Sequence, residues 1–210
     1  MIRRSTVIDV PQLGQLINDC AEQGIMLHRS LSYLYEHLRD FFVITEPHCD
    51  LDSVSDHIAD PTAKKGNTIL GVCGLKVVWA DLAEVYALAV APKARGRGYG
   101  RQLVQACIDE SRHLEIRRLM TLSYEKTFFE KLGFEVVDRQ KLPLKVWSEC
   151  IRCAKNQACD EIAMVFCHVD MPLLEAPGPQ VPPEGSYEVP VVLSGRLSNV
   201  GPRPKMDEAR

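Results

Sequence analysis

The chain has 210 residues, of which 46% are hydrophobic and 25% charged, so it has enough apolar side chains for a buried core and wholesale disorder is excluded. At this length we expect one domain with an appendage rather than two full domains. Twenty-five Lys and Arg against 28 Asp and Glu leave a net charge of -3, which excludes the basic footprint of a nucleic-acid-binding protein.

The expected compartment is the cytoplasm. Eight cysteines are too few for a disulfide scaffold and favour a reducing environment. No window approaches the roughly 20 apolar residues of a membrane helix, and the N-terminus lacks the apolar stretch of a signal peptide. We therefore expect a soluble protein that has neither a membrane nor a nucleic acid as partner.

The first quarter of the chain predicts a strand, two helices, a strand and a loop. Asp9 is a capping residue type and Pro11 suits a first helical turn, so together they indicate where the first helix begins. Apolar residues at helical spacing continue to Gly24. In chain order, the predicted elements are a strand over 2–7, helices over 9–24 and 30–40, a strand over 41–45 and a polar, acidic loop over 47–67.

The middle of the chain predicts two long strands and a helix. Residues 68–79 and 83–91 are β-prone runs separated by three residues, which indicates an antiparallel pair. Pro92 ends the second run. A helix over 98–114 follows, with its apolar residues on one face.

The last third combines short elements with a tail of different composition. Mixed helices and antiparallel strands predict an α+β (mixed α/β) single domain over residues 1–171, with a Cys-containing insertion over 138–160. Eight prolines fall between Pro172 and Pro204, so residues 172–210 are expected to form a poorly ordered tail, with 189–193 as one further strand candidate. The predicted short elements are strands over 119–122, 134–137 and 161–169 and a helix over 125–132.

The loop between the second long strand and the following helix has the composition of a diphosphate-binding site. Three glycines leave room for backbone N–H groups to converge, and a helix N-terminus adds partial positive charge. Four cations concentrate there on an otherwise acidic chain: Lys93, Arg95, Arg97 and Arg101. The alternative is a flexible glycine turn with solvated arginines. The order of strand, Pro, Arg, Gly and helix favours phosphate binding, although the pattern matches neither a Walker loop nor a dinucleotide fingerprint.

This loop resembles the pyrophosphate loop of the GNAT superfamily of acyl-CoA N-acetyltransferases, Arg/Gln-x-x-Gly-x-Gly/Ala, which Arg95, Gly98 and Gly100 match. Residues 124–134 resemble the family's later helix-turn-strand motif, so the resemblance covers most of residues 1–170. Residues 27–43, residues 81–85 and the Phe128–Phe129 pair are most similar to the short N-acetylglutamate synthases of bacterial arginine synthesis.

The resemblance implies a central, mostly antiparallel twisted sheet flanked by helices. It also implies direct transfer of an acetyl group from acetyl-CoA to the α-amino group of L-glutamate, or of glutamine, in a ternary complex, as the first step of arginine biosynthesis. Val90 is the favoured backbone donor to the developing oxyanion. The residues implied to bind the co-substrate are Leu88, Ala89, Val90, Arg95, Gly96, Arg97, Gly98, Tyr99, Gly100 and Arg101.

Three residues are candidates for proton transfer. The pKa of a free α-amino group is about 7.7 to 8.0, so a modest base suffices, and Glu84 stands where the family often keeps a carboxylate. A solvent-facing acid at a strand edge is the alternative for Glu84. Many members protonate the CoA thiolate with a Tyr, but this chain has Phe129 at that position, which leaves Ser123 and Tyr124 as the nearest replacements.

Arg29, and after it Lys126, are the candidates for binding the carboxylates of the acceptor, because such a pocket needs cations. Each has the alternative of being an exposed helix residue. Two alternatives to the glutamate activity stay open: acetylation of another small amine or of a protein amine, and a non-catalytic acyl-CoA-binding module. The oligomeric state also stays open, with a homodimer as one alternative.

Cys150, Cys153 and Cys159 lie within ten residues, a spacing that invites a zinc interpretation because two thiolates two residues apart can share one ion. A second paired Cys-x-x-Cys is missing, and Cys159 has the alternative of packing as a small hydrophobe. We therefore assign no metal. Cys20, Cys73 and Cys107 lie on apolar faces and are expected in the core.

Overall fold

The computed structural model describes residues 1–46, 68–139, 142 and 159–172. The chain divides into two units, residues 1–176 and 177–210, and every described residue belongs to the first. The predicted loop over 47–67, the interior of the insertion over 138–160 and the tail from residue 173 onward lie outside the described residues. The domain boundary at residue 171 and the extra strand over 189–193 therefore stay predictions.

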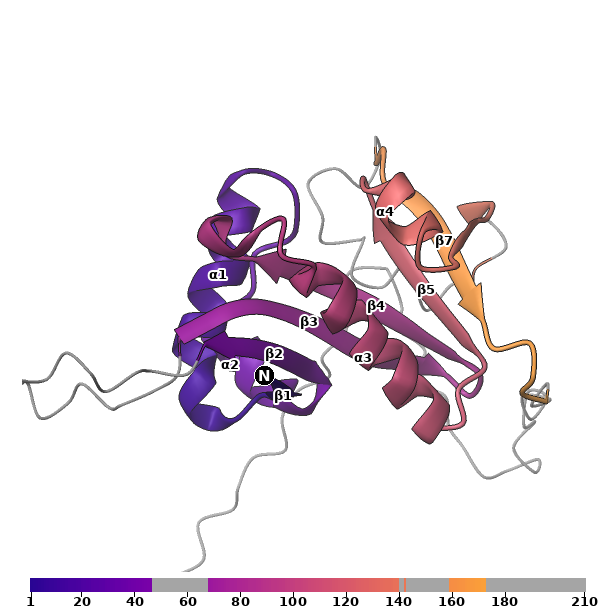
Figure 1. Cartoon of the computed structure of the whole chain (residues 1–210), viewed down its shortest axis with the longest axis horizontal. Helices are drawn as coiled ribbons and strands as arrows, with labels where there is room; N and C mark the ends of the chain where they lie inside the picture. Colours follow the sequence, from indigo (N-terminus) through magenta and orange to yellow (C-terminus); the bar gives the residue numbers. More distant parts are fainter. Residues whose placement is uncertain (47–67, 140–141, 143–158, 173–210) are drawn as a thin grey trace, which may run out of the picture. The chain divides into compact units, whose positions relative to one another are not determined.

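Seven strands form one sheet in the order β1-β2-β3-β4-β5-β7-β6, in which only the β4–β5 pair is parallel. The expected α+β fold with a mostly antiparallel sheet and flanking helices is confirmed (Figure 1). In chain order the elements are β1 (Ile2–Arg4), η1 (Val7–Asp9), α1 (Val10–Glu22), α2 (Leu31–Glu36), η2 (Leu38–Asp40), β2 (Phe41–Glu46), β3 (Thr68–Trp79), β4 (Leu82–Val90), η4 (Pro92–Ala94), α3 (Tyr99–His113), β5 (Arg118–Ser123), α4 (Lys126–Glu130), β6 (Glu135–Val136) and β7 (Ile162–Cys167).

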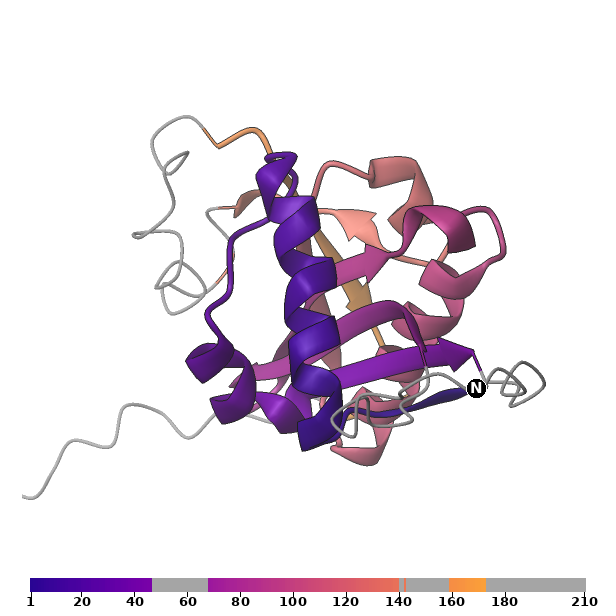
Figure 2. The same cartoon turned by 90° about the vertical axis from the view of Figure 1, so that its left-hand side faces the viewer.

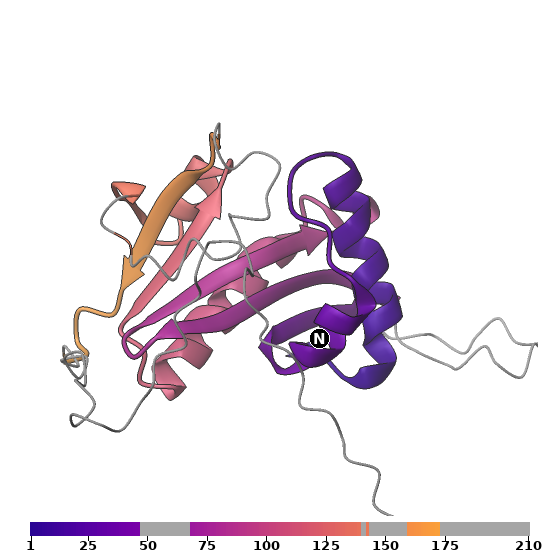
Figure 3. The same ribbon diagram turned by 180° about the vertical axis from the view of Figure 1, so that it is seen from behind.

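The helices cover both faces of the sheet. Helix α3 lies across one face in Figure 1, and α1 crosses in front of the strands in Figure 2. Figure 3 shows α3 behind the sheet and α1 and α2 on the near side. Each face has its own core: Leu103, Val104 and Cys107 of α3 are buried on one, and Leu13 and Ile17 of α1 on the other. Among the described residues, no helix is long and apolar enough to cross a membrane.

Two local predictions near the N-terminus need correction. Asp9 precedes α1, but its carboxylate makes no cap there; it accepts hydrogen bonds from Arg3 at 2.6 and 2.8 Å and from the Thr6 N–H at 2.7 Å. The charged donor of Arg3 competes successfully for this carboxylate. The predicted helix over 30–40 ends at Glu36, because His37 leaves the helical region, and continues as the 3₁₀ turn η2.

Strand β4 diverges from β5 after a short paired segment. The register pairs Leu82, Ala83 and Glu84 with β5 and then ends. Figure 1 shows the two strands together at one end and apart at the other. Against β3, the β4 strand carries one extra residue between Tyr86 and Ala89, where Ala87 has a φ of 49°. This bulge and the divergence leave the later half of β4 with an edge that β5 does not cover.

Candidate active site

The glycine loop takes a backbone conformation that only glycine adopts readily. Gly96 and Gly98 have φ values of 77° and 76°, in the left-handed region. A Cβ at either position would meet nothing within 4 Å, so the requirement for glycine comes from the backbone angles and not from crowding by the protein. A Cβ at Gly100 would make ordinary contacts with Phe128 at 3.5 Å.

The loop leads directly into the N-terminus of α3, a helix of 15 residues. Gly98 is its N-cap, and the first helical hydrogen bond runs from Gln102 N to Gly98 O at 3.1 Å. The N–H groups of the three residues between them therefore precede the hydrogen-bond ladder and point out of the helix end. Arg97 and Arg101 are exposed beside them. Converging N–H donors, the positive end of a helix and two exposed guanidinium groups fit a diphosphate.

The end of β4 presents backbone groups to its open edge. Ala91 N donates to Leu70 O of β3 at 2.8 Å, so the alternation of an antiparallel ladder turns the N–H and C=O of Val90 away from β3. The Val90 carbonyl accepts a hydrogen bond from Arg95 Nε at 3.3 Å. The side chain of Arg95 thus links the glycine loop to the backbone of the residue that was predicted to stabilise the oxyanion.

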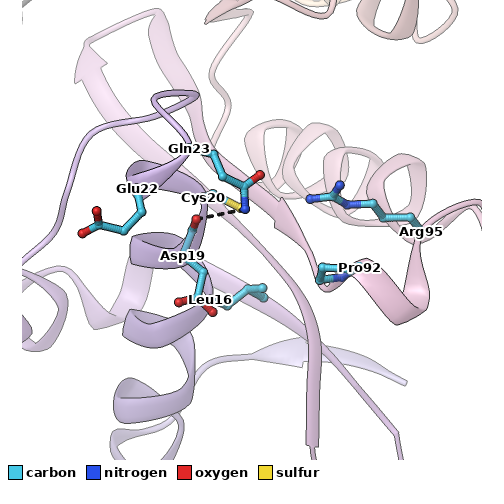
Figure 4. Close-up of a pocket in the computed structure, with 7 residues that line it drawn as sticks. All are labelled: Leu16, Asp19, Cys20, Glu22, Gln23, Pro92 and Arg95. Carbon is cyan, nitrogen blue, oxygen red and sulfur yellow. Dashed lines mark hydrogen bonds between the residues drawn. The ribbon is translucent and has the colours of Figure 1, made fainter.

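A pocket of about 380 Å³ lies beside this loop, lined on one side by α1 between Leu16 and Gln23 and on the other by Pro92 and Arg95. In Figure 4 the guanidinium of Arg95 points toward α1. Burial raises the pKa of the Cys20 thiol on α1, and the nearby charge of Arg95 opposes that rise. The residues that line this pocket come from α1, its C-cap and the segment after β4, and none comes from β5.

Glu84 lies on a central strand and forms an ion pair. Its residue partner in the β3 register is Lys76, and its Oε2 atom lies 3.6 Å from Lys76 Nζ. The two side chains are 17% and 23% exposed, which does not fit the alternative of a solvent-facing edge acid. Sequence reasoning missed Lys76, because its place opposite Glu84 depends on a register shift between Val77 and Trp79 that counting outward from the predicted turn does not reveal.

Arg29 lies on the connection between α1 and α2, where Asn18 fixes its backbone through hydrogen bonds of 2.9 and 3.0 Å. Its guanidinium carbon is 4.4 Å from the ring centre of Tyr33 and 5.8 Å from that of Tyr86. Lys76 Nζ lies 5.6 Å from the same Tyr86 ring. The structure therefore brings Arg29 and Lys76, and through Lys76 also Glu84, to one aromatic side chain of β4.

Tyr86 is a further residue that sequence reasoning missed. It is 8% exposed, and its hydroxyl donates a hydrogen bond to Asp40 Oδ2 at 3.0 Å. Burial, the Asp40 carboxylate and Tyr33 raise the pKa of Tyr86 far above its usual value, so the hydroxyl stays protonated. Burial also raises the pKa of Asp40, while the hydrogen bond from Tyr86 and nearby cations oppose that rise.

The other predicted residues lie where β5, after diverging from β4, leads into α4. Ser123 Oγ accepts a hydrogen bond from Glu125 N at 3.0 Å, and Tyr124 is 36% exposed. Lys126 pairs with Glu130 one turn along its own helix, at 3.5 Å, and both side chains are about half exposed. Phe129 is 3% exposed and packs edge-on against Phe128 and Phe134, so this position is part of the core.

Among the described cysteines, three are buried, Cys159 is partly exposed and Cys167 is exposed. Cys20, Cys73 and Cys107 are buried, as expected. Cys150 and Cys153 lie outside the described residues, and the Cys159 thiol donates to Glu161 at 3.6 Å. Within the described part of the chain, no group of three or more His, Cys, Asp or Glu side chains is arranged to hold a metal ion.

Comparison with known proteins gives a consistent picture. Residues 31–134 match the family described as the Acetyltransferase (GNAT) family. An uncharacterised N-acetyltransferase of Chlorobaculum tepidum is 31% identical over 164 residues, which cover 78% of this chain and 94% of that protein. An amino-acid acetyltransferase of Mycobacterium tuberculosis is 30% identical over 152 residues, which cover 72% of this chain and 78% of that enzyme.

Among solved structures, the N-acetylglutamate synthase of Neisseria gonorrhoeae complexed with coenzyme A and N-acetyl-glutamate is similar, with a TM-score of 0.64 and 28% identity. The match covers 80% of this chain and 34% of that one. This chain therefore spans about a third of the Neisseria enzyme.

Proposed function

Because this chain belongs to the acetyltransferase (GNAT) family, we propose that it transfers an acetyl group from acetyl-CoA to the α-amino group of L-glutamate, with glutamine as a second acceptor. The observation that carries this proposal is the grouping of Glu84, Lys76 and Arg29 around Tyr86, on a strand that leads to the glycine loop. A dicarboxylic amino acid needs cations for its carboxylates and a base for its ammonium group, and this cluster contains both.

The co-substrate diphosphate would be held by the N–H groups at the start of α3, with Arg97 and Arg101 beside them. Leu88 and Ala89 would lie along the pantetheine chain, because they precede the glycine loop on the open part of β4. The thioester carbonyl would then accept a hydrogen bond from the Val90 N–H, which points away from β3 and stabilises negative charge on that oxygen. Arg95 would fix the orientation of this peptide unit through its hydrogen bond to the Val90 carbonyl.

Glu84 would accept a proton from the ammonium group of the acceptor, directly or through a water molecule, and the neutral amine would attack the thioester carbonyl. Its ion pair with Lys76 restricts the position of the carboxylate beside the proposed acceptor site. The departing thiolate would take a proton from Tyr124 or Ser123. A thiol pKa near 8.5 makes this protonation a small part of the barrier.

Amino-acid acetyltransferase activity of this kind is the first step of arginine biosynthesis, and the cytoplasm is the compartment that supplies both substrates. The test is release of free CoA by the full chain in the presence of acetyl-CoA and a panel of amino acids, with mass-spectrometric identification of the product. We expect turnover with glutamate. Turnover only with another amine or a protein amine would contradict the glutamate assignment, and tight CoA binding without turnover for any amine would indicate a non-catalytic module.

A further inference from the structure

The ring of Tyr86 occupies space that any side chain at position 74 would take. Gly74 is the β3 residue paired with Tyr86, and a Cβ built on it would lie 2.5 Å from Tyr86 Cε1 and 2.8 Å from Cζ. Contacts this short do not occur, so the ring lies flat across the strand because residue 74 has no side chain. Phe41 limits the ring on another side, with 5.3 Å between ring centres.

The hydroxyl end of the same side chain is also fixed. Asp40 lies at the end of η2 and accepts the Tyr86 hydroxyl at 3.0 Å. This hydrogen bond is partly buried, and a hydrogen bond to a carboxylate is stronger than one between neutral groups. Tyr86 therefore has one orientation, set by the backbone of β3 at one end and by Asp40 at the other.

Two cations from separate segments lie within reach of this ring. Arg29 comes from the connection after α1 and Lys76 from β3, and their charged groups lie 5.8 and 5.6 Å from the ring centre. An aromatic ring attracts a cation within about 6 Å. Both side chains are long and would otherwise sample many rotamers, so a fixed ring within reach of both restricts the distance between two positive charges, together with Tyr33 at 4.4 Å from Arg29 and Glu84 at 3.6 Å from Lys76.

We propose that Tyr86 is a positioning residue that holds Arg29 and Lys76 at the spacing required by an acceptor with two carboxylates. This inference rests on the proposed function, because it assigns the acceptor side of the same site. It also explains why a buried tyrosine on β4 is hydrogen-bonded to Asp40 and faces a glycine instead of packing as a plain apolar side chain.

The first test compares Tyr86→Leu with Tyr86→Phe, and uses Tyr35→Leu on the exposed side of α2 as the matched control. Removing two cation–ring contacts should raise the KM for glutamate about tenfold in Tyr86→Leu while the KM for acetyl-CoA stays unchanged. Tyr86→Phe keeps the ring and should show a smaller rise. An equal rise in both KM values would overturn the positioning role, and so would a normal glutamate KM in a folded Tyr86→Leu.

The second test repeats the comparison with an acceptor in which both carboxylates of glutamate are amides. The wild-type protein should use this neutral analogue poorly, and Tyr86→Leu should add no further penalty, because no acceptor charge is left for the cations to bind. A merely structural role of Tyr86 predicts the same penalty with both acceptors, and that result would contradict the proposal.

The third test uses glutarate, a plain dicarboxylate, as a probe that needs no turnover. Calorimetry should show binding to the wild-type chain and about tenfold weaker binding to Tyr86→Leu. Glutarate binding without acetylation of glutamate would remove the proposed function and leave the positioning role standing. If the chain acetylates glutamate but binds glutarate equally well with and without Tyr86, the proposed function stands and the positioning role is overturned. Absence of glutarate binding to the wild type would also overturn the positioning role.

Discussion

Glu84 and Lys76 face each other across the β3–β4 ladder, with the carboxylate oxygen and the ammonium nitrogen 3.6 Å apart. If Glu84 is the base, Glu84→Gln should lower kcat by about 10² to 10⁴, the usual contribution of a positioned base, while the KM for acetyl-CoA changes little. Steady-state kinetics checks this, with Glu130→Gln as the control, because Glu130 pairs with a lysine outside this cluster. A kcat within a few-fold of wild type would remove Glu84 from the mechanism.

Two glycines with left-handed backbone angles allow the effect of backbone strain on stability to be separated from an effect on acetyl-CoA binding. Gly98 and Gly24 have φ values of 76° and 70°, and a Cβ at either meets nothing within 4 Å. Alanine at either position should lower the free energy of unfolding by about 1 to 2 kcal/mol, the cost of a left-handed non-glycine residue. Only Gly98→Ala should also raise the KM for acetyl-CoA, because Gly24 lies at the end of α1. Equal KM values in the two variants would argue against phosphate binding by the loop.

Kinetics can decide whether Lys76 or Lys126 binds the acceptor. Lys76→Ala should raise the KM for glutamate by about tenfold or more, since a hydrogen bond to a charged group contributes about 1.5 to 3 kcal/mol. Lys126→Ala should leave it unchanged, because this exposed side chain pairs with Glu130 on its own helix. The KM for each acceptor, measured at saturating acetyl-CoA, decides between them, and the opposite ranking would move the acceptor site toward α4.

A buried histidine far from the glycine loop should make stability depend on pH. His168 is 3% exposed, and Arg112 donates to its Nδ1 at 3.1 Å, so the ring proton lies on Nε2 and faces Ser111 Oγ at 2.9 Å. Burial and the charge of Arg112 lower the pKa of His168, against the opposing effects of Asp170 and Asp109.

The sign follows from proton uptake. Below the ordinary value of 6.5 the unfolded chain binds a proton that the folded chain resists, so stability is lost as the pH falls from 6.5 toward the lowered pKa. Urea unfolding of the wild type and of His168→Gln, above and below pH 6.5, measures the difference. The wild type should lose more stability than the variant on acidification. Parallel losses would mean that His168 does not carry the dependence.

Local patterns predicted the elements better than the site. Residues 68–79 form β3 with unchanged bounds, because twelve β-prone residues leave no competing interpretation. The glycine loop was found because its signal is contiguous in sequence. The break at His37 was missed because it depends on one non-helical residue inside an amphipathic pattern.

Tyr86 and Lys76 were missed for a different reason. Their grouping depends on the register of β3 with β4 and on its shift between Val77 and Trp79, which changes which residues of the two strands are paired. Arg29 comes from a third segment, where Asn18 holds its backbone and Tyr33 lies against its guanidinium. A site assembled from three segments has no contiguous signature to detect.

The divergence of β4 from β5 means that the folded chain leaves part of its own sheet unfinished. Beyond Glu84, the described residues of β5 form no ladder with β4, so the outward N–H of Val90 is not used by a neighbouring strand, while its carbonyl accepts from Arg95. A co-substrate lying there would act as the missing neighbour. Binding of the co-substrate would then make the later half of β4 more rigid. Slower amide hydrogen exchange at the end of β4 would report this binding without any chemical step.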